Sequence, residues 1–166
     1  MSDENSFHQH VAWRLFLMSH SVLTKAVTAA LDEAGCISFD TYDVLVTLSE
    51  APGGLMKMGD LANATFFSNS GISRRAARLE EEGLMKRVRC GDDGRVFYAT
   101  LTPAGRKALR DAWPVYRKVI DNVFVRSLSK EKAQAMTAMF RTVLREVDTG
   151  LLERWIEEDR TDEPMC

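Results

Sequence analysis

Hydroxyl, amide and guanidinium side chains gather on one predicted helix in the middle of the chain. At about 100° per residue, Ile72, Ala76 and Leu79 fall on one side of this helix and form its buried face. The opposite side carries short polar groups and an arginine, which can hydrogen-bond the base edges and phosphates of a DNA major groove. The candidate DNA contacts on the helix and at its entry are Ser68, Asn69, Ser70, Ser73, Arg74, Arg75 and Arg78. Solvated surface arginines would give the same pattern, and Ser68 also suits a helix N-cap. The helix alone therefore does not distinguish a DNA-binding helix from an ordinary surface helix.

A second basic segment follows this helix. Residues 84–89 and 96–101 are rich in β-forming side chains and flank a Gly-Asp-Asp-Gly turn at residues 91–94, which predicts a β-hairpin. An arginine on a thin turn can enter a narrow, A·T-rich minor groove, where the potential is most negative. The candidate contacts here are Arg87, Asp93 and Arg95, with Asp93 holding Arg95 in place. The alternative is an ordinary turn with a surface ion pair.

The charge of the chain is unevenly distributed. Its 166 residues include 22 basic and 24 acidic side chains, a net charge of −2, whereas a basic domain is the usual mark of nucleic-acid binding. Residues 74–110, however, carry 10 basic and 5 acidic side chains, and the segments on both sides are acidic. The candidate DNA contacts therefore lie in or beside a locally basic segment.

Other classes of protein find little support. No serine, cysteine or carboxylate arrangement suggests a catalytic centre, so we expect neither an enzyme nor a cofactor. His8, His10 and His20 could ligate a metal, but His8 and His10 lie in an N-terminus expected to be mobile, and no metal site is predicted. No signal peptide or membrane span is evident, so we expect a soluble, cytoplasmic protein that does not contact membranes.

Helical periodicity predicts the elements that must position these residues. Helices are expected over residues 7–34, 39–50 and 59–65, over a fourth segment from Ser68 to Gly83, and from residue 103 onward with a kink at Pro114. A last helix is expected over residues 130–158, with a frayed tail at 159–166. Ser38, Thr102 and Ser129 are the expected N-caps. This order predicts a mainly α fold with a small β-hairpin wing, a winged helix-turn-helix between long terminal helices that need a partner surface of their own.

Five short motifs in this order resemble the MarR family of bacterial winged helix-turn-helix transcriptional regulators. They are Asp60-Leu61-Ala62, Ser68-Asn69-Ser70-Gly71-Ile72-Ser73-Arg74, Arg78-Leu79-Glu80-Glu81-Glu82-Gly83-Leu84, Asp93-Gly94-Arg95 and Leu101-Thr102-Pro103-Ala104-Gly105-Arg106. The resemblance covers about residues 38–109. Thr65-Phe66-Phe67, Gly71 and Arg75 depart from the family's usual residues, Arg75 standing where an apolar residue is common.

The resemblance implies a homodimer on a pseudo-palindromic operator in double-stranded DNA. Recognition helices would enter successive major grooves and the wings the flanking minor grooves, with half-sites about 34–36 Å apart. The implied organisation is an N-terminal dimerisation helix (residues 1–37), a DNA-binding domain (residues 38–103) and C-terminal dimerisation helices (residues 104–166).

The resemblance also implies a small, often aromatic, effector bound between the dimerisation and DNA-binding parts. The candidate lining residues are Trp13, Phe16, Tyr42, Trp113 and Tyr116. Aromatic residues at helical spacing are equally typical of a protein core or a dimer interface, so this alternative stays open.

The resulting hypothesis is a dimeric, sequence-specific transcriptional regulator, a repressor that an effector releases from DNA. One alternative is a winged-helix adaptor that binds proteins and not DNA. Another is a thiol redox-sensing regulator using Cys36 or Cys90, since Arg89 beside Cys90 could favour its thiolate. With Cys166, these cysteines fit no zinc pattern and no disulfide framework.

Overall fold

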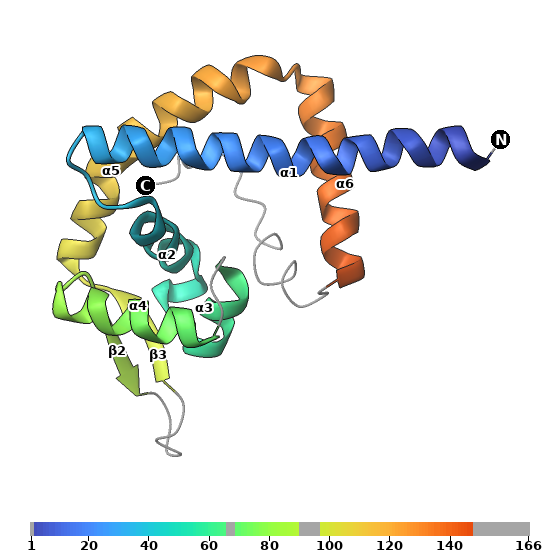
Figure 1. The fold of residues 1–166 in the computed structure, drawn as a ribbon. Coiled ribbons are helices and arrows are strands. Elements are labelled where there is room, and N and C mark those ends of the chain that lie inside the picture. The colour runs from blue at the N-terminus through green and yellow to red at the C-terminus, as the bar shows by residue number, and fades with distance from the viewer. Residues whose placement is uncertain (1, 66–68, 90–96, 148–166) are drawn as a thin grey trace.

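The computed structural model describes residues 2–65, 69–89 and 97–147 and shows a mainly helical chain with a small sheet (Figure 1). The helices are α1 (Ser2–Glu33), α2 (Phe39–Glu50), α3 (Met58–Ala64), α4 (Asn69–Glu81), α5 (Pro103–Val123) and α6 (Lys130–Val147). The strands are β1 (Met56–Lys57), β2 (Met85–Arg89) and β3 (Phe97–Leu101), and short 3-10 turns cover Pro52–Gly54 and Val125–Ser127. The predicted fold class is therefore confirmed.

The predicted helix boundaries rest on local hydrogen bonds that the structure contains. The Ser38 hydroxyl accepts a hydrogen bond from the Thr41 N–H at 3.3 Å, and α2 begins at the next residue, as predicted. Thr102 caps α5 by accepting from the Gly105 N–H at 3.0 Å. Gly83, at φ 71°, follows α4 and suits the left-handed conformation that ends a helix. Short polar residues and one glycine thus fix where three helices start or stop.

Two predicted helices differ in extent from the structure. α1 begins at Ser2, five residues before the predicted start, because a polar N-terminal turn shows no apolar periodicity to predict it from. α6 is described to Val147, and the remainder of the predicted helix and tail, residues 148–166, lies outside the described residues. α5 continues through Pro114 as one helix, and Figure 1 shows its axis changing direction along its length.

The sheet has three antiparallel strands in the order β1-β3-β2. The predicted hairpin supplies β2 and β3, paired from Met85 opposite Leu101 to Arg89 opposite Phe97. β1 was not predicted; Met56 pairs with Ala99 on the other edge of β3. A strand of two residues is too short to show the period-two alternation from which strands are predicted. β1 ties the start of α3 to the wing.

One core joins α2, α3, α4, the sheet and the adjoining ends of α1 and α5. Its largest fully buried side chains are those of Val27, Leu31, Val44, Leu45, Leu48, Leu61, Ile72, Leu79, Met85, Leu101 and Leu109. At the joint between the sheet and α5, the Thr102 hydroxyl donates to the Gly83 carbonyl at 2.6 Å. A Cβ at Gly105 would collide with the Leu84 backbone carbonyl, so this close approach requires glycine.

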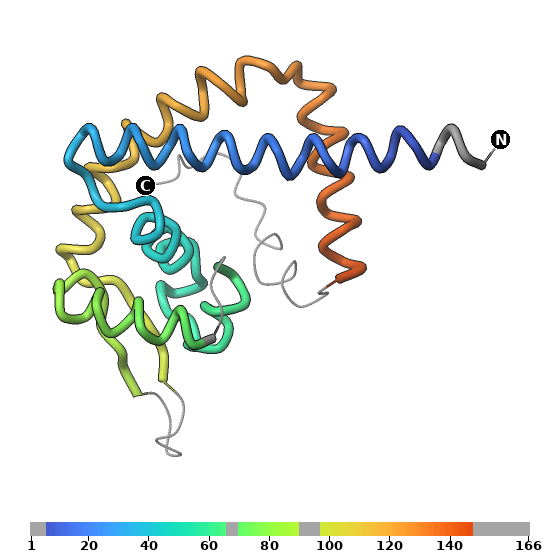
Figure 2. Tube along the Cα trace, in the orientation of Figure 1, coloured from blue at the N-terminus to red at the C-terminus, as the bar shows by residue number. Residues whose placement is uncertain are grey.

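The terminal helices extend away from this core. Figures 1 and 2 show α1 as one straight helix whose C-terminal end lies over the core and α5, while its N-terminal half projects beyond them. α6 crosses the projecting half, where the Phe16 and Phe140 rings lie 5.4 Å apart between centroids. Within the described parts of the chain, no helix combines the length and apolar character needed to cross a membrane.

Candidate nucleic-acid interface

The two faces of α4 lie as the periodicity predicts. Ile72, Ala76 and Leu79 are buried, and Ser70 and Arg74 are exposed on the opposite side. Ser73 is exposed beside them, and Asn69 is the first residue of the helix. Ser68, the predicted cap, lies outside the described residues. α4 therefore presents short hydroxyl groups and a guanidinium to solvent, as a helix that reads a DNA groove must.

Two of the three predicted arginine contacts on α4 are ion-paired within the protein. The Arg75 Nη2 lies 2.5 Å from the Asp40 Oδ2 at the start of α2. The Arg78 Nε lies 2.7 Å from the Glu82 Oε1 one turn further along α4, and this hydrogen bond raises the pKa of the guanidinium. Arg74 forms no ion pair with another described residue. Arg74 is therefore the arginine of α4 most available to an external phosphate or base.

Arg87 and Glu80 join the wing to α4. The Arg87 N–H donates to the Glu80 Oε1 at 2.7 Å, and its Nε donates to the Glu80 Oε2 at 2.6 Å. These contacts lower the pKa of the Glu80 carboxyl, chiefly through the side-chain hydrogen bond. We call this pair the α4–wing clasp. It combines backbone and side-chain donors on one carboxylate, which fixes the orientation of β2 against α4.

The described part of the wing carries exposed cations on both faces of β2. Lys86 and Arg89 are exposed on β2, and the Arg89 guanidinium lies 5.1 Å from the centroid of the Phe97 ring on β3. The turn that carries Asp93 and Arg95 lies outside the described residues, so their predicted roles stay predictions. The stem of the wing thus supports cationic side chains next to the exposed face of α4.

A cavity of about 430 Å³ separates the wing from α4 and the start of α3. Its lining residues are Lys57, Met58, Gly59, Asp60, Ser73, Arg87 and Phe97. Lys57, the last residue of β1, is an exposed cation that the sequence analysis did not select. Its position beside Ser73 and Arg87 depends on the unpredicted pairing of β1 with β3, so no local signal pointed to it.

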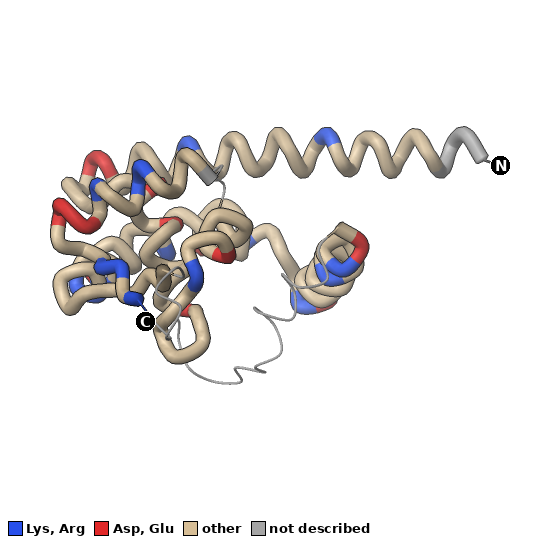
Figure 3. The backbone as a smooth tube through the Cα atoms, turned by 90° about the horizontal axis from the view of Figure 1, so that it is seen from below, with Lys and Arg blue, Asp and Glu red and all other residues tan. Residues whose placement is uncertain are grey.

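Figure 3 views the molecule from the side of the wing and α4 and shows how the charges are distributed. Basic and acidic positions are interspersed in the winged part, whereas the projecting half of α1 is almost without charge. Between residues 5 and 31 the only charged side chains are those of Arg14 and Lys25. The two parts of the molecule therefore expose surfaces of different chemistry.

The five candidate effector residues separate into two groups. Trp13 and Phe16 stack on each other on α1, with centroids 5.7 Å apart. Tyr42 of α2 and Tyr116 of α5 stack at 4.5 Å, and the Trp113 ring lies 5.9 Å from Tyr116. Within one chain the structure thus brings Tyr42, Trp113 and Tyr116 together and leaves Trp13 and Phe16 as a separate pair, and their role in binding an effector stays a prediction.

Tyr42 and Tyr116 line a cavity of about 220 Å³ between α1, α2 and α5. The other lining residues are His20, Leu23, Thr24, Val27, Phe39, Asp43, Val46 and Ile120. Burial raises the pKa of the Tyr116 hydroxyl, and the negative charges of Asp43 and Glu50 raise it further. The cavity thus combines apolar walls with a negative local potential.

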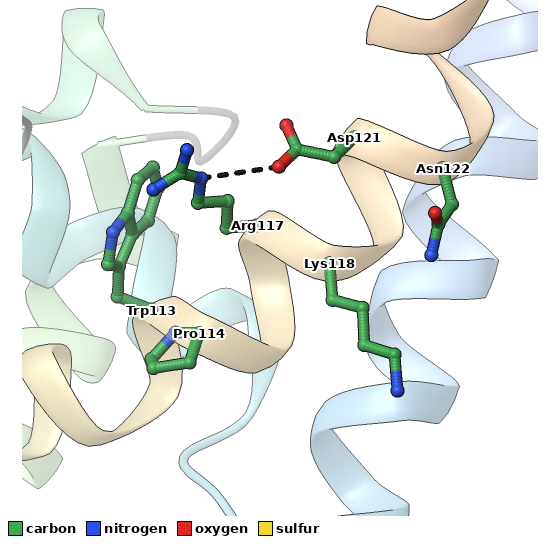
Figure 4. A pocket seen from close by; sticks show the side chains of 6 residues that line it. All are labelled: Trp113, Pro114, Arg117, Lys118, Asp121 and Asn122. Carbon is green, nitrogen blue, oxygen red and sulfur yellow. Dashed lines mark hydrogen bonds and ion pairs between the residues drawn. The ribbon is translucent and has the colours of Figure 1, made fainter.

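Trp113 instead borders a separate, open hollow of about 390 Å³ on α5 (Figure 4). Arg117 and Asp121, 3.2 Å apart in an ion pair, lie on the same side as Trp113, whereas Lys118 and Asn122 point away from it. Because these side chains all belong to one helix, the hollow has no opposing wall of its own.

The cysteines and histidines add no further centre to the described structure. Cys36 is a free, half-buried thiol that packs against the core, and Cys90 and Cys166 lie outside the described residues. Among residues 2–65, 69–89 and 97–147, no three His, Cys, Asp or Glu side chains are grouped as metal ligands.

Comparison with known proteins finds one family model and several solved structures that are similar to this chain. The MarR family model matches residues 37–96. AbsC, a MarR family transcriptional regulator from Streptomyces coelicolor, has a TM-score of 0.75 and 28% identity, over 90% of this chain and 97% of AbsC. Sco3205 from the same organism, a MarR family regulator solved in complex with DNA, has a TM-score of 0.74 and 25% identity, over 85% of this chain and 88% of Sco3205.

A third structure, the MepR–DNA complex from S. aureus, has a TM-score of 0.66 and 21% identity, over 83% of this chain and 98% of MepR. At this identity the comparison shows a similar fold and nothing more. The comparison with curated proteins gave no match. The predicted resemblance is confirmed: residues 37–96 match the MarR family model, and the chain is similar in fold to MarR family transcriptional regulators.

Proposed function

We propose that this protein is a homodimeric regulator of transcription that binds a pseudo-palindromic DNA operator and leaves it when a small effector binds. The observation that carries the proposal is the exposed polar face of α4, with Ser70, Ser73 and Arg74, held beside a basic wing by the α4–wing clasp. The N-terminal half of a helix can enter a major groove when its exposed side chains are short and polar. The cations of β2 lie where the backbone of the same duplex would pass.

An apolar stripe on α1 supports the dimer. Phe7, Val11, Leu15, Met18 and Val22 lie within one face at helical spacing, and each is 38–65% exposed. Phe16, on the other side of α1, contacts Phe140 of α6. A large exposed apolar surface on a helix with few charges is stabilised in water when a second copy covers it. A pair of copies would place two reading units on one duplex.

The cavity lined by Tyr42 and Tyr116 supports an effector site for a single aromatic ring. A dry cavity of about 150 Å³ suffices for benzene, and this one measures about 220 Å³. Because Asp43 lies in its lining and the local potential is negative, a neutral phenol or a cationic aromatic amine is favoured over an aromatic carboxylate.

Selection of bound sequences from a random duplex pool tests DNA recognition and symmetry together. We expect an enriched pseudo-palindrome whose half-sites lie about one helical turn, or 34–36 Å, apart. Fluorescence anisotropy should then give a specific affinity at least about a thousandfold tighter than for random duplex, falling steeply with salt. A flat, negligible affinity for every duplex would refute DNA binding and favour a winged-helix protein adaptor.

Two arginine variants test which parts read the operator. Arg74→Ala and Arg95→Ala should each weaken operator binding by about 1–3 kcal/mol at fixed salt. Lys107→Ala is the matched control, since Lys107 is an exposed cation of α5 paired with Asp111 at 2.6 Å. Equal losses in all three variants would indicate general electrostatic attraction instead of a defined interface.

Calorimetric titration with phenol, benzylammonium and benzoate tests the effector site. Phenol and benzylammonium should bind and lower operator affinity, and benzoate should bind more weakly than either. Asp43→Asn should reduce the difference in affinity between benzylammonium and benzoate, whereas Lys107→Ala should leave that difference unchanged. Preferential binding of benzoate to the unaltered protein would contradict the proposed ligand chemistry.

A further inference from the structure

The side chain of Arg75 is less exposed than that of Arg78 on the same helix, and its charge is paired with a residue of α2. Its side chain is 22% exposed, whereas that of Arg78, one turn later, is 72% exposed. The Arg75 guanidinium donates to the Asp40 carboxylate at 2.5 Å, across 35 residues of sequence. The pair therefore connects two helices, in contrast to the Arg78–Glu82 pair, which joins α4 to the residue that directly follows it.

The helix that carries Asp40, α2, is held firmly by its packing in the core. Val44, Leu45 and Leu48 of α2 are fully buried, and α2 packs against α5, α3 and β3. Asp40 lies in the first turn of α2, where a negative charge also interacts favourably with the helix dipole. An ion pair anchored on this turn restrains the element at its other end, which is α4.

The same geometry removes Arg75 from the surface that a duplex would touch. The exposed face of α4 carries Ser70, Ser73 and Arg74, while Arg75 is directed to α2 and is only partly exposed. Contact with a phosphate would require Arg75 to leave Asp40, which would then remain as an unpaired negative charge near the duplex.

We propose that Arg75 is a positioning residue that holds the recognition helix α4 on α2 through Asp40, and not a contact to DNA. This inference rests on the proposed DNA-binding function, and it departs from the sequence prediction that Arg75 binds phosphate. Its role is to set the angle at which Ser70, Ser73 and Arg74 meet the groove.

A double-mutant cycle with salt titration tests the proposal. Arg75→Gln and Asp40→Asn should each weaken operator affinity about three- to fivefold, and the double variant should lose no more than either single one. The slope of log affinity against log salt should not change in Arg75→Gln, whereas the control Arg74→Gln should lower its magnitude by about 1. Affinity for random duplex should be unaltered by Asp40→Asn.

If Arg75 contacts a phosphate of the DNA instead, the opposite pattern of affinities and salt slopes is expected. Arg75→Gln would then lower the salt slope by about 1, and Asp40→Asn would strengthen binding because the arginine is released and a negative charge is removed. Either result overturns the proposal, as do additive losses in the double variant or unchanged affinity in both single variants.

Hydrogen exchange in the protein without DNA supplies a readout independent of the proposed function. Asp40→Asn and Arg75→Gln should accelerate exchange of the same α4 amides about threefold, and Arg74→Gln should not. Unchanged exchange in both variants overturns the positioning role even if the protein binds no duplex at all. Accelerated exchange without any DNA binding would instead leave Arg75 as a positioning residue and refute the DNA-binding function.

Discussion

The winged part and the terminal helices bury their apolar residues very differently. Every buried hydrophobic residue of the described chain lies between Val27 and Ala112. α6 contains no buried residue, and the apolar stripe of α1 is exposed along its length. Both parts are helical and rich in apolar residues, so the difference lies in whether a partner surface is present. The winged part is covered by residues of its own chain, whereas the exposed apolar side chains of the terminal helices are those that the proposed dimer would cover.

The largest expected effect on stability comes from a substitution in the buried core of the winged part. Leu45→Ala, at a fully buried position of α2, should lower the free energy of unfolding by about 2–5 kcal/mol through lost burial and the resulting cavity. Urea denaturation followed by circular dichroism measures it. Val147→Ala, at an 81% exposed position of α6, should change stability by less than about 0.5 kcal/mol. Similar losses at both sites would remove the distinction between the two parts.

The second largest effect is expected at the joint between the sheet and α5, where the chain passes close to itself at Gly105. Gly105→Ala places a Cβ against the Leu84 backbone carbonyl and should cost about 1–3 kcal/mol of stability, because neither backbone can easily move. Gly59→Ala, where a Cβ meets no other atom, is the matched control and should be neutral or slightly stabilising in the helix α3. Thermal melts of the two variants should therefore shift by different amounts, and equal shifts would contradict the close approach.

A third prediction tests whether the terminal helices need a second copy. Leu15→Asn combined with Val22→Asn removes two apolar side chains from the α1 stripe. Sedimentation equilibrium should show the dimer dissociation constant rising at least about tenfold, since each buried side chain contributes more than about 1.4 kcal/mol. Circular dichroism should show the helices of the core retained. A protein that is monomeric before substitution would refute the dimer.

The smallest effect concerns the boundary between the two parts. Because the pKa of Tyr116 is raised above its ordinary value of 10.0, the folded state resists ionisation of this hydroxyl more than the unfolded state does. Stability is therefore intact below about pH 10 and decreases as the pH rises further. Tyr116→Phe should lessen this decrease, which urea denaturation at a series of pH values above 10 measures. An equal decrease in the unaltered protein and in Tyr116→Phe would contradict the prediction.

Elements defined by local pattern were predictable from the sequence. Ser38 and Thr102 carry hydroxyls that cap their helices, and apolar periodicity identified the buried face of α4. These features depend on residues within one or two turns of each other. The family motifs lie in the same region, so the helices and the β2–β3 pair of the described winged part were predicted.

Features that depend on distant partners were not predictable. Asp40 lies 35 residues before Arg75, and nothing in either local sequence indicates their ion pair. β1 is a strand only because β3 lies beside it, and Lys57 is near Ser73 only because β1 forms. The aromatic residues of the two separate groups share similar helical spacing, which cannot reveal which of them meet.

The α4–wing clasp has a consequence for the genetics of the operator. Because Glu80 accepts both the backbone N–H and the side chain of Arg87, α4 and the stem of the wing move as one unit. One inserted base pair turns a duplex by about 34° and lengthens it by about 3.4 Å, since a turn of about 34–36 Å holds 10–10.5 base pairs. A rigid reading unit cannot follow that change within a half-site. Insertions inside a half-site should therefore inactivate an operator completely, with no compensating shift in the wing.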